Sequence, residues 1–195
     1  MYAAIKRGLD LVASVLILLV LTPILVPIMI ALRLTGEGAV FYRQQRVGYR
    51  DDMFGIWKFA TMLKNSPNMG TGSLTVRGDP RVTPVGKYLR STKINELPQL
   101  LNVVTGEMSF VGPRPERPQF VDQLEEQLPY YAERHMVKPG ITGWAQINYP
   151  YGASVDDARH KLEYDLYYAK NYSPFLDLLI LLQTLKVVLW PSGAR

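Results

Sequence analysis

The sequence predicts a mainly helical α+β fold, with a compact cytoplasmic domain behind an N-terminal re-entrant membrane helix. Three observations lead to this class. The 22 residues from Leu11 to Leu32 carry no charge and are almost all apolar. The rest of the chain has the charge and apolar content of an ordinary soluble domain. Within that remainder, helical apolar spacing dominates and strand-like patterns are short. We therefore expect a membrane anchor over residues 1–34 and a folded domain with membrane-interface helices over residues 35–195.

The composition narrows the classes of function. A chain of 195 residues has room for one domain with or without an appendage. The absence of cysteine excludes disulfide scaffolds, thiolate zinc sites and cysteine nucleophiles. A formal charge of +5 indicates an anionic partner, which is a nucleic acid, an anionic membrane surface or a phosphorylated substrate.

The apolar stretch has two features that are unusual for a simple membrane span. Pro23 and Pro27 lie near its middle, where each removes a backbone donor. Basic residues flank it on both sides, whereas a spanning helix carries its positive flank on the cytoplasmic side. A helix broken at Thr22–Pro23 enters and leaves through the same face, and the Thr22 hydroxyl can satisfy a carbonyl freed at the hinge. A single proline-kinked span is the alternative. No small-residue cleavage site follows, so the segment is not a signal peptide.

The first half of the domain is expected to be irregular. Residues 40–59 read as a hairpin of short strands, residues 64–79 as a loop and residues 85–91 as a helix. A further helix is predicted to begin at Asn95, with Asn95 as its N-cap and Pro98 in its first turn, and to end at Gly106.

The second half is expected to be helical. We predict an amphipathic helix over residues 119–133, a turn-rich segment over 138–152, and two helices between residues 155 and 190 that are broken at Ser173–Pro174. The last helix either packs into the core or lies in the membrane interface with Trp190 at the headgroup level.

Several familiar catalytic patterns are absent. The sequence has no phosphate-binding P-loop, no G-x-G-x-x-G and no nucleophile elbow, and Gly70-Thr71-Gly72 alone is a weak signal. His135 and His160 do not lie in a metal-ligand spacing, and we interpret His135 as structural. No recognition motif accompanies the basic residues, so nucleic acid is not an expected partner.

What remains is a group of phosphate-competent residues around one acid. Arg90, Lys93 and Arg114 flank Glu96, and Lys58 lies upstream. Arginine matches phosphate oxygens in a bidentate fashion, and a helix beginning at Asn95 would direct its free N–H groups to the same place. An ionised Glu96 among these cations can bind Mg²⁺ or act as a nucleophile. The alternative is a solvated helix N-terminus with surface arginines.

Several longer motifs follow in an order that resembles the bacterial sugar transferases, and specifically the catalytic module of the small monotopic phosphoglycosyl transferases. The resemblance covers nearly the whole chain. Its motifs are Lys6-Arg7-Gly8-Leu9-Asp10, the broken apolar helix, Gln44-Gln45-Arg46 with Gly48, Asn95 to Val103, Met108 to Pro115, and Lys138 to Gln146.

The resemblance implies an initiating enzyme of exopolysaccharide or glycan assembly on the cytoplasmic face of the bacterial inner membrane. Such enzymes move a sugar 1-phosphate from a UDP-sugar to undecaprenyl phosphate, a polyprenol phosphate, and release UMP. They use Mg²⁺, contact membrane lipid through a re-entrant helix, and form a covalent intermediate on an aspartate of an Asp-Glu dyad. It implies that Thr22–Pro23 is the membrane hinge, that Arg90, Arg114 and Lys58 bind phosphate, and that Glu96 is catalytic and a metal ligand.

Two positions depart from the family pattern. Asn95 occupies the position of the usual aspartate, and the usual K-[FL]-R-[ST]-M reads Lys58-Phe59-Ala60-Thr61-Met62. A neutral amide cannot form an acyl phosphate. Glu96 therefore takes over as nucleophile with Asn95 beside it, or the transfer is direct, or the protein is a non-catalytic membrane-anchored sugar-nucleotide-binding or scaffold module. The sequence does not name the sugar, although residues 149–152 are a candidate specificity loop.

Overall fold

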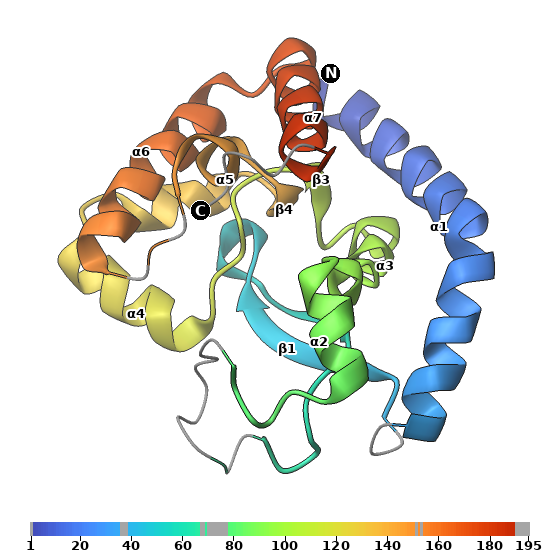
Figure 1. Ribbon diagram of the computed structural model, residues 1–195. Coiled ribbons are helices and arrows are strands. Elements are labelled where there is room, and N and C mark those ends of the chain that lie inside the picture. Colours follow the sequence, from blue (N-terminus) through green and yellow to red (C-terminus); the bar gives the residue numbers. More distant parts are fainter. Residues whose placement is uncertain are drawn as a thin grey trace. The chain divides into compact units, whose positions relative to one another are not determined.

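A computed structural model describes residues 2–35, 39–66, 69, 78–150, 152 and 154–189 (Figure 1). Most of the expected loop at 64–79, Tyr151 of the expected specificity loop, and Trp190 lie outside the described residues. The chain divides into two compact units. The larger unit contains residues 1–13, 45–55 and 102–195, and the smaller unit contains residues 14–44 and 56–101. The mainly helical fold class is confirmed.

Helix α1 runs from Tyr2 to Thr35 as one uninterrupted helix that includes Pro23 and Pro27 (Figure 1). It is long and apolar enough to cross a membrane by length and composition, and only 6% of its most apolar window is buried. The Thr22 hydroxyl donates to the Leu18 carbonyl at 2.8 Å. This carbonyl lies one residue before the one that Pro23 leaves without its usual donor, so the hydroxyl bonds within the preceding turn.

The smaller unit is built around the end of α1. The expected hairpin is confirmed as strands β1 (Phe41–Val47) and β2 (Met53–Phe59), which pair in a two-stranded sheet and extend from one unit into the other. Helix α2 (Pro84–Ser91) is also confirmed, with the Thr83 hydroxyl accepting from the Gly86 N–H as its N-cap. Leu32, Phe59 and Leu89 form the buried core of this unit.

The prediction that a helix begins at Asn95 is wrong. Residues Ile94–Glu96 form a 3-10 helix, η3, which is preceded by Lys93 in the left-handed conformation, and α3 begins only at Gln99 and ends at Thr105. Asn95 lies inside the 3-10 turn and does not cap a helix. Pro98 has no N–H to donate to the Ile94 carbonyl, and this carbonyl accepts instead from the Leu97 N–H, which closes the 3-10 turn. Gly106, with φ +87°, ends α3 as expected.

The larger unit contains a parallel strand pair that the sequence pattern did not reveal. Strand β3 (Ser109–Val111) pairs with β4 (Gly140–Thr142), and each has only three residues. A Cβ at Gly112 would collide with the Lys138 carbonyl, so this close approach of the backbones requires glycine. Helix α5 (Trp144–Asn148) follows β4 directly.

Helix α4 covers Pro118–Gln127 and therefore ends earlier than the predicted 119–133. Leu128 is extended because Pro129 follows it, and the chain continues as the 3-10 helix η4 (Tyr131–Met136). The buried core here includes Val121, Leu128 and Leu162.

The two C-terminal helices and their break are confirmed as α6 (Val155–Asn171) and α7 (Pro174–Leu189). The expectation that α7 packs into the core is confirmed for one face of the helix. Leu176 and Ile180 are buried in the core, whereas a second row of large apolar residues is exposed. That row is Phe175, Leu178, Leu182 and Leu185.

The Lys6–Asp10 motif ties the start of α1 to the larger unit. Lys6 forms an ion pair with the buried Asp177. Arg7 donates to the carbonyls of Val103 and Val104, the second at 2.7 Å, and so satisfies free carbonyls at the end of α3. Asp10 accepts from the Phe110 N–H. The motif therefore has a structural role, because it fixes the start of α1 within the larger unit.

A buried ion pair joins η4 to α6. The guanidinium of Arg134 donates to Asp165 Oδ2 at 2.7 and 3.0 Å, and it also donates to the Tyr131 hydroxyl at 2.8 Å. The side chains of Arg134 and Asp165 are 6% and 3% exposed. Burial raises the pKa of Asp165, although Arg134 acts in the opposite direction. The carboxylate therefore depends on its partner to remain charged in the interior.

We predict that Asp165→Asn lowers the free energy of unfolding by about 3–5 kcal/mol, because it leaves the Arg134 charge buried without its counterion. Chemical denaturation in detergent micelles measures the loss. Glu163→Gln, an exposed change on the same helix, is the control and is expected to change stability by less than about 0.5 kcal/mol. Equal stability of the two variants would contradict a structural role for the pair.

Candidate active site around Glu96

Glu96 lies beside Lys58 in the smaller unit. The Lys58 Nζ is 3.2 Å from Glu96 Oε1, and the two side chains are 18% and 24% exposed. Glu96 comes from the 3-10 turn η3 and Lys58 from strand β2. A partly buried lysine at this distance favours the ionised form of the carboxylate. The charge partner of Glu96 is thus a side chain, and the helix N-terminus that the sequence suggested is not present, because α3 begins three residues later and is only seven residues long.

Arg90 is held by Thr61. Its Nε donates to the Thr61 hydroxyl at 2.8 Å. The Thr61 carbonyl accepts from the Thr83 N–H at 3.0 Å, which joins the end of β2 to the start of α2. Burial lowers the pKa of Arg90, and the nearby Arg81 lowers it further. An arginine remains charged near neutral pH in spite of this, so Arg90 supplies a positioned cation.

The segment before α2 is fixed by a second buried pair. Arg81 donates from Nε and Nη2 to the two carboxylate oxygens of Asp79, at 2.9 and 2.7 Å. It also donates to the carbonyls of Ser66 and Met69. Arg81 therefore acts as a structural residue that fixes the segment before α2.

Arg114 belongs to the larger unit, where its backbone is held firmly. Every carbonyl from residue 113 to residue 116 accepts a hydrogen bond. The donors are the Gly140 N–H to Pro113, Arg134 to Arg114, Arg46 to Pro115, and the Val47 N–H to Glu116. These bonds from three segments fix the backbone of Arg114.

The structure thus brings some of the expected site residues together within one unit. Lys58 contacts Glu96, and helix α2, which carries Arg90, packs against η3, which carries Asn95 and Glu96. Asn95 is half-buried. Thr61 was missed as a positioning residue, although its place in the Lys58–Met62 motif was a usable signal. Tyr149 of the expected specificity loop donates to Asp157 at 3.1 Å and stacks on His160.

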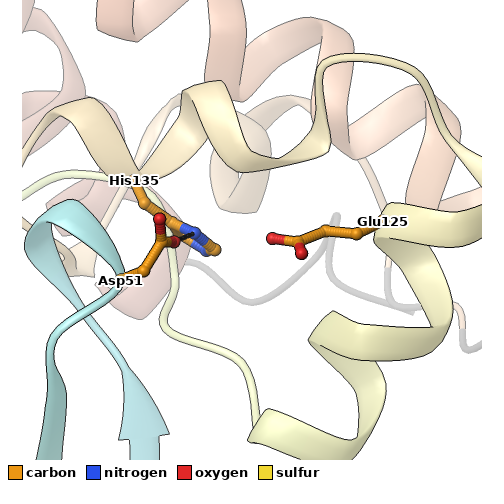
Figure 2. Close-up of side chains that lie close together, drawn as sticks. All are labelled: Asp51, Glu125 and His135. Atoms are coloured by element: carbon orange, nitrogen blue, oxygen red, sulfur yellow. Dashed lines mark hydrogen bonds and ion pairs between the residues drawn. The ribbon is translucent and has the colours of Figure 1, made fainter.

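His135 is buried, and its Nδ1 lies 2.6 Å from Asp51 Oδ1. Its ring also packs edge-on against Tyr131. Figure 2 shows that Glu125 directs its carboxylate toward the same ring. Among the described residues, Asp51, Glu125 and His135 are the one group of three potential ligands close enough to hold a metal ion. No metal-ligand spacing in the sequence predicts this group, because its members are contributed by three separate segments.

The residues at Glu96 fit a magnesium ion of the kind that is bound together with a phosphorylated substrate. Mg²⁺ is usually held by one or two carboxylates, by substrate phosphates and by water, and a complete protein cage is uncommon. Glu96 offers one carboxylate that is partly open to solvent, and the side-chain oxygen of Asn95 is adjacent in sequence. This donor set suits the hard cation, provided that the substrate supplies the remaining ligands.

The chain belongs to the bacterial sugar transferase family, whose pattern matches residues 1–191. It is 45% identical over its whole length to a UDP-N-acetylgalactosamine-undecaprenyl-phosphate N-acetylgalactosaminephosphotransferase of Aeromonas hydrophila, and it covers 46% of that protein. It is 44% identical over 97% of its length to an undecaprenyl-phosphate glucose phosphotransferase of Komagataeibacter xylinus, of which it covers 36%.

A third relative is closer to this chain in size. The chain is 38% identical over 97% of its length to a UDP-glucose:undecaprenyl-phosphate glucose-1-phosphate transferase of Caulobacter vibrioides, and it covers 71% of that protein. The chain spans less than half the length of the first two relatives. These matches confirm the family that the motifs indicated.

We predict that Thr61→Val lowers the free energy of unfolding by about 1.5–3 kcal/mol, since the charged Arg90 loses its hydroxyl acceptor at nearly constant side-chain volume. Thr61→Ser keeps the hydroxyl and is the matched control. Thermal unfolding of the two variants beside the wild type measures the difference. If valine and serine have the same effect, the Arg90–Thr61 bond does not contribute to stability.

Proposed function

We propose that this chain is a phosphoglycosyl transferase that moves a sugar 1-phosphate from a UDP-sugar to undecaprenyl phosphate and releases UMP. Membership of the sugar transferase family supports this activity, and the three relatives described above are named for transfers to undecaprenyl phosphate. The observation that carries the proposal is Glu96, a carboxylate beside Lys58 and next to the helix that bears Arg90.

In the proposed reaction Glu96 is the nucleophile. Its carboxylate oxygen attacks the β-phosphorus of the UDP-sugar, a P–O bond to Glu96 forms, and the P–O bond to the UMP phosphate breaks. A phosphate oxygen of undecaprenyl phosphate then attacks the same phosphorus and releases the carboxylate. Both steps exchange one P–O bond for another, so the sugar keeps its own phosphate throughout.

The surrounding cations hold the negative charge of the donor. Lys58 neutralises Glu96 before substrate binds, and with a diphosphate present it can share its donors between the carboxylate and a phosphate oxygen. Arg90 would bind a phosphate of the donor through paired N–H donors. For Arg114, phosphate binding stays an expectation from the family motif. Mg²⁺, held by Glu96, Asn95 and the substrate phosphates, would offset charge on the diphosphate.

Asn95 departs from the family pattern, in which this position is an aspartate, and the proposed mechanism has to account for the change. Its amide cannot serve as the nucleophile, but its N–H groups can donate to a phosphate oxygen and its oxygen can accept from a bound water. The alternative is a non-catalytic sugar-nucleotide-binding or scaffold module at the membrane. The names of the relatives do not favour that alternative, since each one states a transfer.

We also propose that α1 is a re-entrant anchor on the cytoplasmic face of the inner membrane, with its hinge at Thr22–Pro23. Each end of α1 packs against folded protein of its own unit: Lys6, Arg7 and Asp10 on the larger unit, and Leu32 in the core of the smaller one. Among the described residues, no other helix is a candidate span. If the rest of the chain does not cross the membrane, the two ends of α1 lie on the same side of it.

The exposed apolar row of α7 is proposed to lie in the same membrane interface. An exposed stripe of Phe175, Leu178, Leu182 and Leu185 is costly in water, whereas it is stable against acyl chains at the headgroup boundary. This placement would keep the phosphate of the lipid substrate in the membrane surface, so that the enzyme does not extract it.

We predict that wild-type protein incubated with Mg²⁺ and a UDP-sugar gains the mass of one sugar phosphate, whereas Glu96→Gln gains none and loses at least about 100-fold in UMP release. Intact-mass analysis and a UMP assay with undecaprenyl phosphate in detergent measure the two effects. UDP-glucose and UDP-N-acetylgalactosamine are the first donors to test, and EDTA is expected to stop turnover until Mg²⁺ is restored.

Glu133→Gln, an exposed change in the larger unit, is the control and should behave as wild type. Full turnover in Glu96→Gln would refute its role as nucleophile. Turnover without an adduct would indicate direct transfer. Silence of the wild type with every donor, together with activity in Asn95→Asp, would support the non-catalytic module.

The topology prediction uses the natural absence of cysteine. Ala4→Cys and Leu34→Cys place single thiols at exposed positions at the two ends of α1. In intact cells a membrane-impermeant maleimide should label neither, and in inverted membrane vesicles it should label both. Labelling of one position from each side would establish a spanning helix.

A further inference from the structure

Asp51, Glu125 and His135 come from three separate segments of the larger unit. Asp51 ends the 3-10 turn η1 (Tyr49–Asp51) of the hairpin, Glu125 lies on α4, and His135 lies on η4. One ligand atom from each residue lies within 4.8 Å of the other two. In Figure 2 the imidazole ring lies between the two carboxylates. None of these residues takes part in the proposed transfer chemistry around Glu96.

The imidazole has one nitrogen without a partner. His135 Nδ1 lies 2.6 Å from Asp51 Oδ1, so in the neutral ring Nδ1 carries the proton and donates it to Asp51. The lone pair is then on Nε2, which is buried and has no hydrogen-bond partner among the described residues. The His135 side chain is only 5% exposed. A buried nitrogen lone pair without a hydrogen-bond partner costs free energy of folding unless a ligand binds it.

The charges around the ring favour a cation. Asp51 and Glu125 place two carboxylates close together, and the pKa of Glu125 is raised by burial, then by Asp51 and Asp122. Asp51 has a side chain that is 56% exposed, which leaves an entry path from solvent. Burial and the neighbouring Arg134 lower the pKa of His135, whereas its hydrogen bond to Asp51 raises it.

We propose that Asp51, Glu125 and His135 form a binding site for a first-row transition dication, with Zn²⁺ as the representative ion. Imidazole nitrogen suits Zn²⁺ and its neighbours in the series better than Mg²⁺, which prefers oxygen ligands alone. A carboxylate that accepts the second N–H of a coordinating histidine is the usual support of such a ligand, and Asp51 is placed to give it. Water would complete the coordination on the exposed side.

The site would hold three elements together. Helix α4 contributes Glu125 and η4 contributes the His135 Nε2 as ligands, whereas the hairpin turn contributes Asp51, which accepts from His135 Nδ1 and orients the ring. The turn itself has two successive non-glycine residues, Arg50 and Asp51, in the left-handed conformation. Since η4 also carries Arg134, which bonds the Arg114 carbonyl, the ion would stabilise the support of that segment. Binding to the folded form alone raises the unfolding temperature, and the increase grows with the logarithm of the free ion concentration once this exceeds the dissociation constant.

The test is titration of the full chain in detergent, stripped with a chelator and dialysed, with Zn²⁺ in the presence of excess Mg²⁺. We expect one Zn²⁺ per chain by calorimetry and a higher unfolding temperature. Glu125→Gln, on an exposed side chain, should weaken Zn²⁺ at least about tenfold and reduce the temperature shift. Asp51→Asn should act in the same direction.

Two matched controls separate this site from casual binding. Glu126→Gln changes the neighbouring exposed carboxylate on α4, and His160→Gln removes the other histidine; both should bind as wild type does. The proposal is overturned if wild type takes up no Zn²⁺ under these conditions, or if Glu125→Gln and Glu126→Gln bind equally. UMP release is not the readout, so failure here leaves the transferase proposal untouched.

Discussion

The larger unit depends on the ion pair and the hydrogen bonds that the buried guanidinium of Arg134 makes. A permanent charge in the interior must satisfy its donors, and Arg134 does so through Asp165, the Tyr131 hydroxyl and the Arg114 carbonyl. These partners lie on α6, on η4 and in the loop after β3. A single side chain therefore sets the positions of two helical segments and of the loop that carries Arg114. The short β3–β4 pair and the glycine contacts at Gly112 complete that support.

The corresponding constraint in the smaller unit concerns the charge of Glu96, which lies on an irregular segment of the chain. Asn95 and Glu96 lie in a 3-10 turn and α3 begins only at Gln99, so Glu96 is not at the N-terminus of an α-helix and the expected helix dipole does not act on it. Lys58 supplies the compensating charge from strand β2. An ion pair with a flexible lysine also leaves the carboxylate free to exchange partners when a diphosphate arrives, which a fixed helix terminus would not allow. Asn95 keeps the position polar without adding a second negative charge beside Glu96.

The two sets of potential metal ligands differ in chemistry, and this difference separates their roles. Glu96 and Asn95 offer oxygen alone and need substrate phosphates to complete a coordination sphere, as suits Mg²⁺ in a transfer reaction. Asp51, Glu125 and His135 include a neutral imidazole and need no substrate, as suits a resident ion. The proposed membrane contact has a separate physical basis. Apolar surface on α1 and α7 that the folded units leave exposed needs another apolar phase to cover it.

The sequence by itself determined the family, the membrane helix, the hairpin, α2, and the break between α6 and α7, because these depend on local signals: uncharged length, alternation, proline and long contiguous motifs. It also grouped Glu96, Lys58 and Arg90, which lie in one unit of the structure. Only the tertiary structure decided that Lys58 contacts Glu96, that Thr61 holds Arg90, that Arg81 is structural, and that Asp51, Glu125 and His135 meet. Those pairings join residues far apart along the chain, and no local propensity records them. The strands β3 and β4 were missed for the same reason, since three residues carry too little pattern and their stability comes from the partner strand.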